Sequence, residues 1–311
     1  MTISLNQNEP VKEQSARLAI NPREPILGSE NAILTGTNTS YYVPDYEGCL
    51  SLKTIVSGSA SWEAAGRRFV VHENSYLILN DRQRYTMTIE AARPVTTFCL
   101  FFKRGFVEDV FRSTVLPTDS LLDTPETPNT LRLGFWVKLE SQENRLLESV
   151  RGLRRRVLEG RDRQTLEDDF YSIAAEMISQ HQQTEGTVAR LPAQRTSTKL
   201  ELYRRLLRGR DHLLSSLDQP VRLSEVARAA CLSPSHFHRT FRKVFGETPQ
   251  NYLTRHRLQK AGQLLSQNNL AVTEVCLESG FESLGSFSSL FRRHFGLSPR
   301  EFRRANAKIA R

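Results

Sequence analysis

Two stretches of this sequence combine a ladder of aromatic residues with a free polar and basic face. In the first, Phe237, Phe241 and Phe245 recur every four residues, which places them on one face of a helix. The second stretch repeats the ladder 50 residues later. The opposite faces carry Ser235, His238, Arg239 and Arg242 in the first stretch, and Gly285, Ser286, Ser289, Arg292 and Arg293 in the second. Hydroxyl, imidazole and guanidinium groups donate hydrogen bonds to anions and to base edges, so this chemistry is typical of binding rather than of covalent catalysis.

Positive charge is concentrated in the same part of the chain. The 311 residues include 43 Lys and Arg against 34 Asp and Glu, which gives a net charge of +9. Residues 197–311 hold 20 of the basic and 9 of the acidic residues, whereas residues 1–196 are slightly acidic. This asymmetry favours a polyanion-binding module joined to a near-neutral part. Charge alone leaves a solvated basic face open as the alternative.

Each of the two stretches predicts a helix-turn-helix. In the first copy, Ser233 is a good N-cap, Pro234 fits the first helical position, and Gly246 can end the helix in a left-handed conformation. The second copy repeats this pattern, with Gly280 as the turn and Ser283 as the cap. A helix from Pro249 to about Gln267 separates the copies and would be roughly 27 Å long. Such a spacer could set two helices close to one DNA turn apart, which is ~34 Å.

The duplicated region resembles the C-terminal domain of the AraC/XylS family of bacterial transcription regulators. The resemblance covers about residues 198–305 and is carried by Leu232–Gly246 and Gly280–Pro299. In that family two helix-turn-helix units of one chain bind adjacent major grooves and usually activate transcription. The resemblance therefore implies a sequence-specific DNA-binding regulator, with double-stranded DNA and RNA polymerase as partners, in the bacterial cytoplasm and associated with the nucleoid.

The resemblance also assigns roles to individual residues. Base reading falls on Ser235, His238 and Arg239 in the first unit, and on Gly285, Ser286 and Ser289 in the second. Family members often carry Arg at the position of Ser289 and a longer polar residue at that of Gly285, so the second unit is expected to hold the backbone more than it reads sequence. Phosphate contacts are expected from Arg242, Lys243, Arg255, Arg292 and Arg293. Cys231 stands where Gly is common in the turn, and we expect little strain there.

The first part of the chain predicts a small antiparallel barrel. Short apolar or alternating runs separated by turn residues extend from Tyr41 to Phe102. The resemblance implies that residues 31–120 are a cupin-like sensor barrel for an unknown small-molecule effector, preceded by a loose arm over residues 1–30. Candidates to line an apolar ligand pocket are Trp62, Tyr76, Tyr85 and Phe98. Ordinary barrel core is the alternative role for most of them.

Helical periodicity follows from about Gly134, with Trp136, Leu139, Leu146 and Leu147 opening an apolar stripe. The expected organisation is a helical dimerisation or linker region over residues 121–185, a linker over 186–197 and the double helix-turn-helix domain over 198–311. The predicted fold class is thus α+β and multidomain: an antiparallel barrel with a helical dimerisation region, then an all-α domain. The chain is expected to form a homodimer.

Several other functions are disfavoured by missing residues. A metal-binding cupin needs His-x-His and a carboxylate, whereas the barrel region has only His72, followed by Glu73, so no metal and no cofactor are expected. Nucleophile-elbow and phosphate-loop motifs are absent, and the four cysteines are isolated, which argues against an enzyme. No apolar run is long enough for a membrane span, and the N-terminus lacks the features of a secretory signal. The remaining alternatives are a ligand-independent architectural DNA binder and a cupin-type enzyme with a basic accessory domain.

Overall fold

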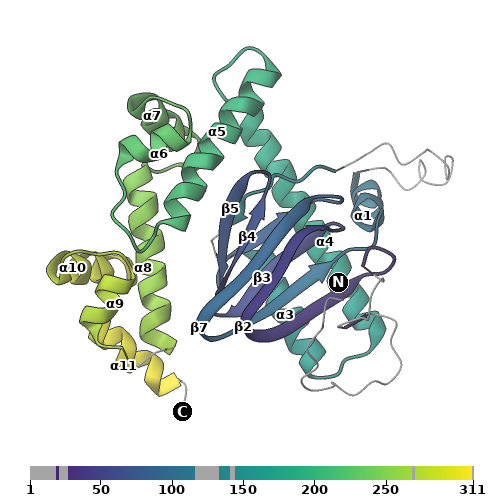
Figure 1. Cartoon of the computed structure of the whole chain (residues 1–311), viewed down its shortest axis with the longest axis horizontal. Coiled ribbons are helices and arrows are strands. Elements are labelled where there is room, and N and C mark those ends of the chain that lie inside the picture. Colours follow the sequence, from purple (N-terminus) through teal and green to yellow (C-terminus); the bar gives the residue numbers. More distant parts are fainter. Residues whose placement is uncertain (1–18, 21–26, 116–132, 141–143, 268–269, 310–311) are drawn as a thin grey trace. The chain divides into compact units, whose positions relative to one another are not determined.

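The computed structural model describes residues 19–20, 27–115, 133–140, 144–267 and 270–309. Contacts divide the chain into two compact units, Met1–Gln182 and Gln183–Arg311. The predicted arm over residues 1–30 lies mostly outside the described residues, as do residues 121–132 of the predicted helical region. Each unit is described below by itself (Figure 1).

The first unit is built on an eight-stranded sheet that curls into a nearly closed barrel. Its strands are β1 (Ala19–Ile20), β2 (Ala32–Glu47), β3 (Ser51–Ser57), β4 (Ser59–Ala64), β5 (Arg67–His72), β6 (Tyr76–Leu79), β7 (Arg84–Phe101) and β8 (Leu139–Glu140). The long strand β7 pairs with β2 along one edge. Its other edge pairs with β4 near Tyr85 and with β3 near Phe101, so one strand belongs to both halves of the barrel. All these β7 pairings are antiparallel, as predicted.

Strand parity gives the sheet an inner face and a helix-covered face. Leu52 of β3 lies opposite Leu100 of β7, and both belong to the core that the sheet shares with the helices. The next residue along β3, Lys53, points to the other side and reaches Tyr85 across the barrel. The helices are α1 (Phe106–Val115), α3 (Arg145–Leu158) and α4 (Arg163–Ala189), and their apolar stripes fill the shared core.

The helical region starts later and its last helix extends further than the sequence predicts. Asn144 caps α3 by accepting a hydrogen bond of 3.1 Å from the Leu147 backbone N–H, so the helix cannot begin near Gly134. Leu139 instead lies in β8, where it pairs with Leu77 of β6. Helix α4 runs through the first third of the predicted linker to Ala189, whose carbonyl accepts a hydrogen bond from Lys199. Only residues 190–195 separate α4 from the next helix.

The second unit is helical, as predicted. Its helices are α5 (Thr196–Ser215), α6 (Leu223–Ala229), α7 (Pro234–Phe245), α8 (Pro249–Gln267), α9 (Val272–Glu278), α10 (Leu284–Phe295) and α11 (Pro299–Ile309). Helix α8 runs between the copy formed by α6 and α7 and the copy formed by α9 and α10 (Figure 1). Helix α5 packs on the first copy. Within the described residues, we find no helix with the length and apolarity required to span a bilayer.

A close contact between α5 and α7 predicts a large effect of a small substitution. A Cβ at Gly209 would lie 2.4 Å from the ring of Phe237, which is fully buried. We expect Gly209→Ala to destabilise the second unit by about 1–3 kcal/mol because the packed ring cannot move away. Gly186→Ala in α4 is the matched control, since nothing lies within 4 Å of its Cβ position. There alanine should stabilise the helix by up to about 1 kcal/mol. Denaturant unfolding followed by circular dichroism checks both, and a stabilising Gly209→Ala would contradict the packing.

Candidate nucleic-acid interface

The two helices with free polar faces begin and end in the same way. Ser233 accepts a hydrogen bond of 3.3 Å from the His236 backbone N–H at the start of α7, and Gly246 ends the helix at φ +78°. At the start of α10, Ser283 accepts a bond of 3.4 Å from the Ser286 backbone N–H, and Gly296 ends that helix at φ +75°. The caps thus fix the bounds of both helices where the sequence predicts them.

The turns before these helices also match. Leu232 N–H donates to the Ala227 carbonyl at 2.9 Å, and Phe281 N–H donates to the Cys276 carbonyl at 3.0 Å. The first turn places Cys231 at φ +51°, a left-handed conformation that a side chain adopts at some expense. Its second-copy equivalent is Gly280, at φ +83°. The two copies are therefore structural repeats and not only similar in sequence.

Both aromatic ladders form the same core. The centroids of Phe241 and Tyr252 are 5.4 Å apart in an edge-to-face contact, and those of Phe291 and Phe302 are 5.3 Å apart in the same geometry. The first two rings of each ladder are fully buried, so one face of α7 and one face of α10 point inward. This burial leaves the opposite faces to solvent, where they can meet a partner.

The predicted contact residues lie on these outer faces. Ser235 and Arg239 are exposed near the start of α7, and His238 is half-buried beside them. Further exposed positions are Arg242 and Lys243 on α7, and Gly285, Ser286, Ser289, Arg292 and Arg293 on α10. Each helix thus presents short or adaptable side chains near its N-terminal end and guanidinium groups in its last turns. This order suits a helix whose first turns enter a groove while its end meets a phosphate backbone.

Arg255 differs from the other predicted phosphate contacts. It is half-buried on α8, and its guanidinium donates to Glu247 at 2.7 and 3.0 Å. It also lies over the ring of Tyr252, 5.1 Å from the centroid. A phosphate contact would have to compete with the Glu247 carboxylate, so Arg255 serves the local packing first.

Sequence reasoning missed the residue that ties the two copies together. Arg257 of α8 donates from Nε to the Leu217 carbonyl at 2.8 Å, and from its terminal nitrogen to the Gln219 carbonyl. These carbonyls precede the first copy, whereas Gly280 of the second copy lies directly against Leu217 and Arg257. The signal in the sequence is weak, because one arginine in a helix rich in polar residues does not reveal a carbonyl partner 40 residues away.

The four aromatic residues predicted to line a ligand pocket do not share one site. Tyr76 and Phe98 belong to the core shared with α3 and α4, and the Tyr76 hydroxyl contacts Gln180 of α4. Trp62 and Tyr85 lie on the inner face of the barrel, since their strands pair with Trp62 opposite Met87 and Ala64 opposite Tyr85. Of the predicted set, Trp62 and Tyr85 therefore share the inner face of the barrel.

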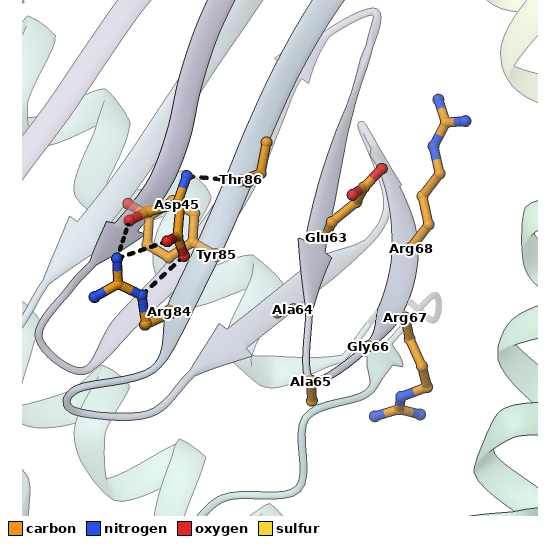
Figure 2. A pocket seen from close by; sticks show the side chains of 10 residues that line it. All are labelled: Asp45, Glu63, Ala64, Ala65, Gly66, Arg67, Arg68, Arg84, Tyr85 and Thr86. Carbon is orange, nitrogen blue, oxygen red and sulfur yellow. Dashed lines mark hydrogen bonds and ion pairs between the residues drawn. The ribbon is translucent and has the colours of Figure 1, made fainter.

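One pocket of about 500 Å³ opens at the ends of β2, β4, β5 and β7 (Figure 2). Its lining residues are Asp45, Glu63, Ala64, Ala65, Gly66, Arg67, Arg68, Arg84, Tyr85 and Thr86. Arg84 lies against Asp45, with hydrogen bonds of 2.7 and 2.8 Å, and this contact lowers the pKa of the Asp45 carboxyl. Among the residues that the structure describes, no three His, Cys, Asp or Glu side chains gather as metal ligands would.

Comparison with known proteins finds similarity in the second unit. A family model described as a helix-turn-helix domain matches residues 226–305. The transcriptional activator RhaS of Klebsiella pneumoniae is 41% identical over 91 residues, which are 29% of this chain and 33% of RhaS. The transcriptional regulator ArgR of Pseudomonas aeruginosa is 33% identical over 89 residues, or 29% of this chain and 27% of ArgR. The chain thus spans about a third of the length of the curated relatives it matches.

A solved structure is also similar to about a third of this chain. The AraC-type DNA-binding domain-containing regulator from Chromobacterium violaceum is 29% identical, covers 34% of this chain and 95% of its own, and has a TM-score of 0.32.

Proposed function

We propose that the whole chain is a sequence-specific, DNA-binding transcription regulator of the AraC type, and the premise is the helix-turn-helix family model that matches residues 226–305. The observation that carries the proposal is the duplication: two helix-turn-helix copies, each with a buried aromatic face and an exposed polar and basic face, lie in one unit. The relatives that match are named as transcriptional regulators, which agrees with regulation rather than catalysis.

In the proposed binding mode, the first turns of each outer face contact bases and the later turns contact phosphates. Arg239, near the start of α7, can bridge the two acceptors of a guanine edge, and His238 and Ser235 can bond neighbouring bases. The basic residues that follow, Arg242 and Lys243, then contact phosphates. On α10 the short residues at 285, 286 and 289 offer at most single contacts, so that helix reads fewer bases and its Arg292 and Arg293 hold the backbone.

We propose that the first unit controls the second through a bound small molecule or through dimerisation. The barrel, α3 and α4 as far as Gln182 belong to one compact unit, which supports a regulatory role. Leu158 and Tyr171 of these helices are large, exposed apolar residues and support a homodimer contact there. Activation of transcription through RNA polymerase, and a place beside the chromosome in the bacterial cytoplasm, belong to the same proposal.

Selection of bound sites from randomised duplex DNA with the full chain tests the proposed function. The expected result is a bipartite site with two half-sites about one helical turn, or ~10 base pairs, apart. The half-site under α7 should be the more defined, since its side chains are longer. Retention of DNA without any enriched sequence would instead support an architectural binder and would contradict the proposal.

A further inference from the structure

Lys53 is a buried cation on the inner face of the barrel. Lys53 is only 1% exposed to solvent. Its ammonium nitrogen lies 3.8 Å from the centroid of the Phe101 ring, 4.6 Å from that of Tyr85 and 3.2 Å from the Tyr85 hydroxyl. The two aromatic faces and the hydroxyl offset part of the desolvation cost of the buried ammonium. They do not supply the negative charge that would neutralise it.

Among the described residues no carboxylate interacts with Lys53, whose side-chain hydrogen bond goes to Tyr85. The ionisable groups that interact with it are the thiols of Cys49 and Cys99. Burial raises the pKa of both thiols, so they remain neutral near pH 7. Burial also lowers the pKa of Lys53 to about 8, which still leaves the ammonium mostly protonated at neutral pH.

The same inner face holds further donors without acceptors. Ser51 lies two residues before Lys53 on β3, and its hydroxyl is buried without a hydrogen-bond partner. The indole N–H of Trp62 is likewise buried without a partner. The Tyr85 hydroxyl accepts from Lys53, which leaves its own proton to donate. Buried donors normally find acceptors, so unmatched donors on the same face as a buried cation indicate an acceptor that the protein does not supply.

We propose that the inner face of the barrel binds a small carboxylate with an apolar body, and that Lys53 is its counter-ion. The inference deepens the proposed function, on which it rests, by assigning the chemical class of the effector. A carboxylate carries one negative charge and accepts several hydrogen bonds, which matches one ammonium with hydroxyl and indole donors. The surrounding Phe101 and Tyr85 rings suit an apolar body. A phosphate ester would bring a second negative charge, and in the described part of the barrel Lys53 has no second buried cation beside it to meet that charge.

The pocket at the strand ends shares the residue Tyr85 with this site. Ala64 and Tyr85 line the pocket (Figure 2). Tyr85 is also the residue that contacts Lys53. The same opening is lined by three basic residues, Arg67, Arg68 and Arg84. It is lined by two acidic residues, Asp45 and Glu63. A rim with more positive than negative groups raises the local concentration of an anion.

Calorimetric titration and thermal melting of the full chain test the proposal with defined probes. The probes are hexanoate and benzoate, each compared with its uncharged amide at constant ionic strength. We expect at least one carboxylate to bind at least tenfold more tightly than its amide and to raise the melting temperature. Lys53→Met should abolish this preference. Lys103→Met, which replaces an exposed lysine, should keep it.

The pH dependence provides a second readout that needs no variant. Binding requires the protonated ammonium, and its pKa is about 8 before a ligand binds. Affinity for the carboxylate should therefore fall by more than about tenfold between pH 7 and pH 9.5. Equal binding of acid and amide, an unchanged preference in Lys53→Met, or no binding of either carboxylate by the wild-type chain would overturn the proposal. Sequence-specific DNA binding measured on the same samples separates this failure from failure of the proposed function.

Discussion

Gly280→Ala should destabilise the second unit by roughly 2–5 kcal/mol, the largest effect that we expect of any single methyl group in this chain. Gly280 is at φ +83°, and a Cβ there would lie 2.0 Å from the Leu217 carbonyl oxygen. That oxygen is backbone and accepts the Arg257 bond, so it cannot move without loosening the tie between the copies. Denaturant unfolding and the affinity for a bipartite DNA site should both report the loss.

Cys231→Ala is the matched control, because Cys231 is the equivalent turn residue of the first copy. Its side chain is exposed and already occupies a left-handed position at φ +51°. Exchange of one side chain for another there should change stability by less than about 0.5 kcal/mol. If Gly280→Ala were as harmless as Cys231→Ala, the contact between the second turn and Leu217 would be wrong.

Arg239→Ala should weaken binding to the selected DNA site by about 1–3 kcal/mol and relax sequence preference at one or two base pairs. Arg239 is exposed near the start of α7, where a recognition helix meets base edges. Affinities for the selected duplex and for a scrambled duplex of the same length measure the effect. The loss should be confined to the selected duplex.

Arg242→Ala is the control on the same exposed face of α7, nearly one turn further on. It should weaken binding to both duplexes about equally and lower the slope of affinity against salt by roughly one unit, because we expect it to contact a phosphate. If Arg239→Ala instead reduced the affinity for both duplexes by the same factor, Arg239 would contact the DNA backbone. The assignment of the base-reading face would then be wrong.

The helix-turn-helix copies could be predicted closely because their signals are local. The caps Ser233 and Ser283, the helix-ending Gly246 and Gly296, and the phenylalanine ladders are each readable within one or two turns of helix. The barrel class was predictable for the same reason, from short strands separated by turn residues. The start of α3 was misplaced because apolar residues of an irregular segment and of β8 happen to continue the helical spacing.

The sequence could not show which of the four aromatic residues share a face of the sheet, because the pattern of a fully buried strand does not reveal which side points inward. Strand β6 is buried at every residue, so its pattern gives no parity. Register with β3 places Tyr76 opposite Thr54, on the helix-covered face, and hence away from Trp62 and Tyr85. Lys53 was overlooked because a lysine in a strand is usually exposed, and only the closure of the barrel shows that it is buried.

The most direct test of the central claim is the affinity of the full chain for its selected duplex and for a scrambled duplex. Both affinities are measured between roughly 50 and 200 mM salt, the range over which phosphate contacts make the affinity depend strongly on salt. The two exposed basic faces predict that the logarithm of affinity falls linearly with the logarithm of salt, with a slope of about −0.9 for each phosphate contacted. Base reading by α7 predicts that the selected duplex binds at least ~10³-fold more tightly than the scrambled one. A slope near zero, or equal affinity for both duplexes at every salt concentration, would contradict the account.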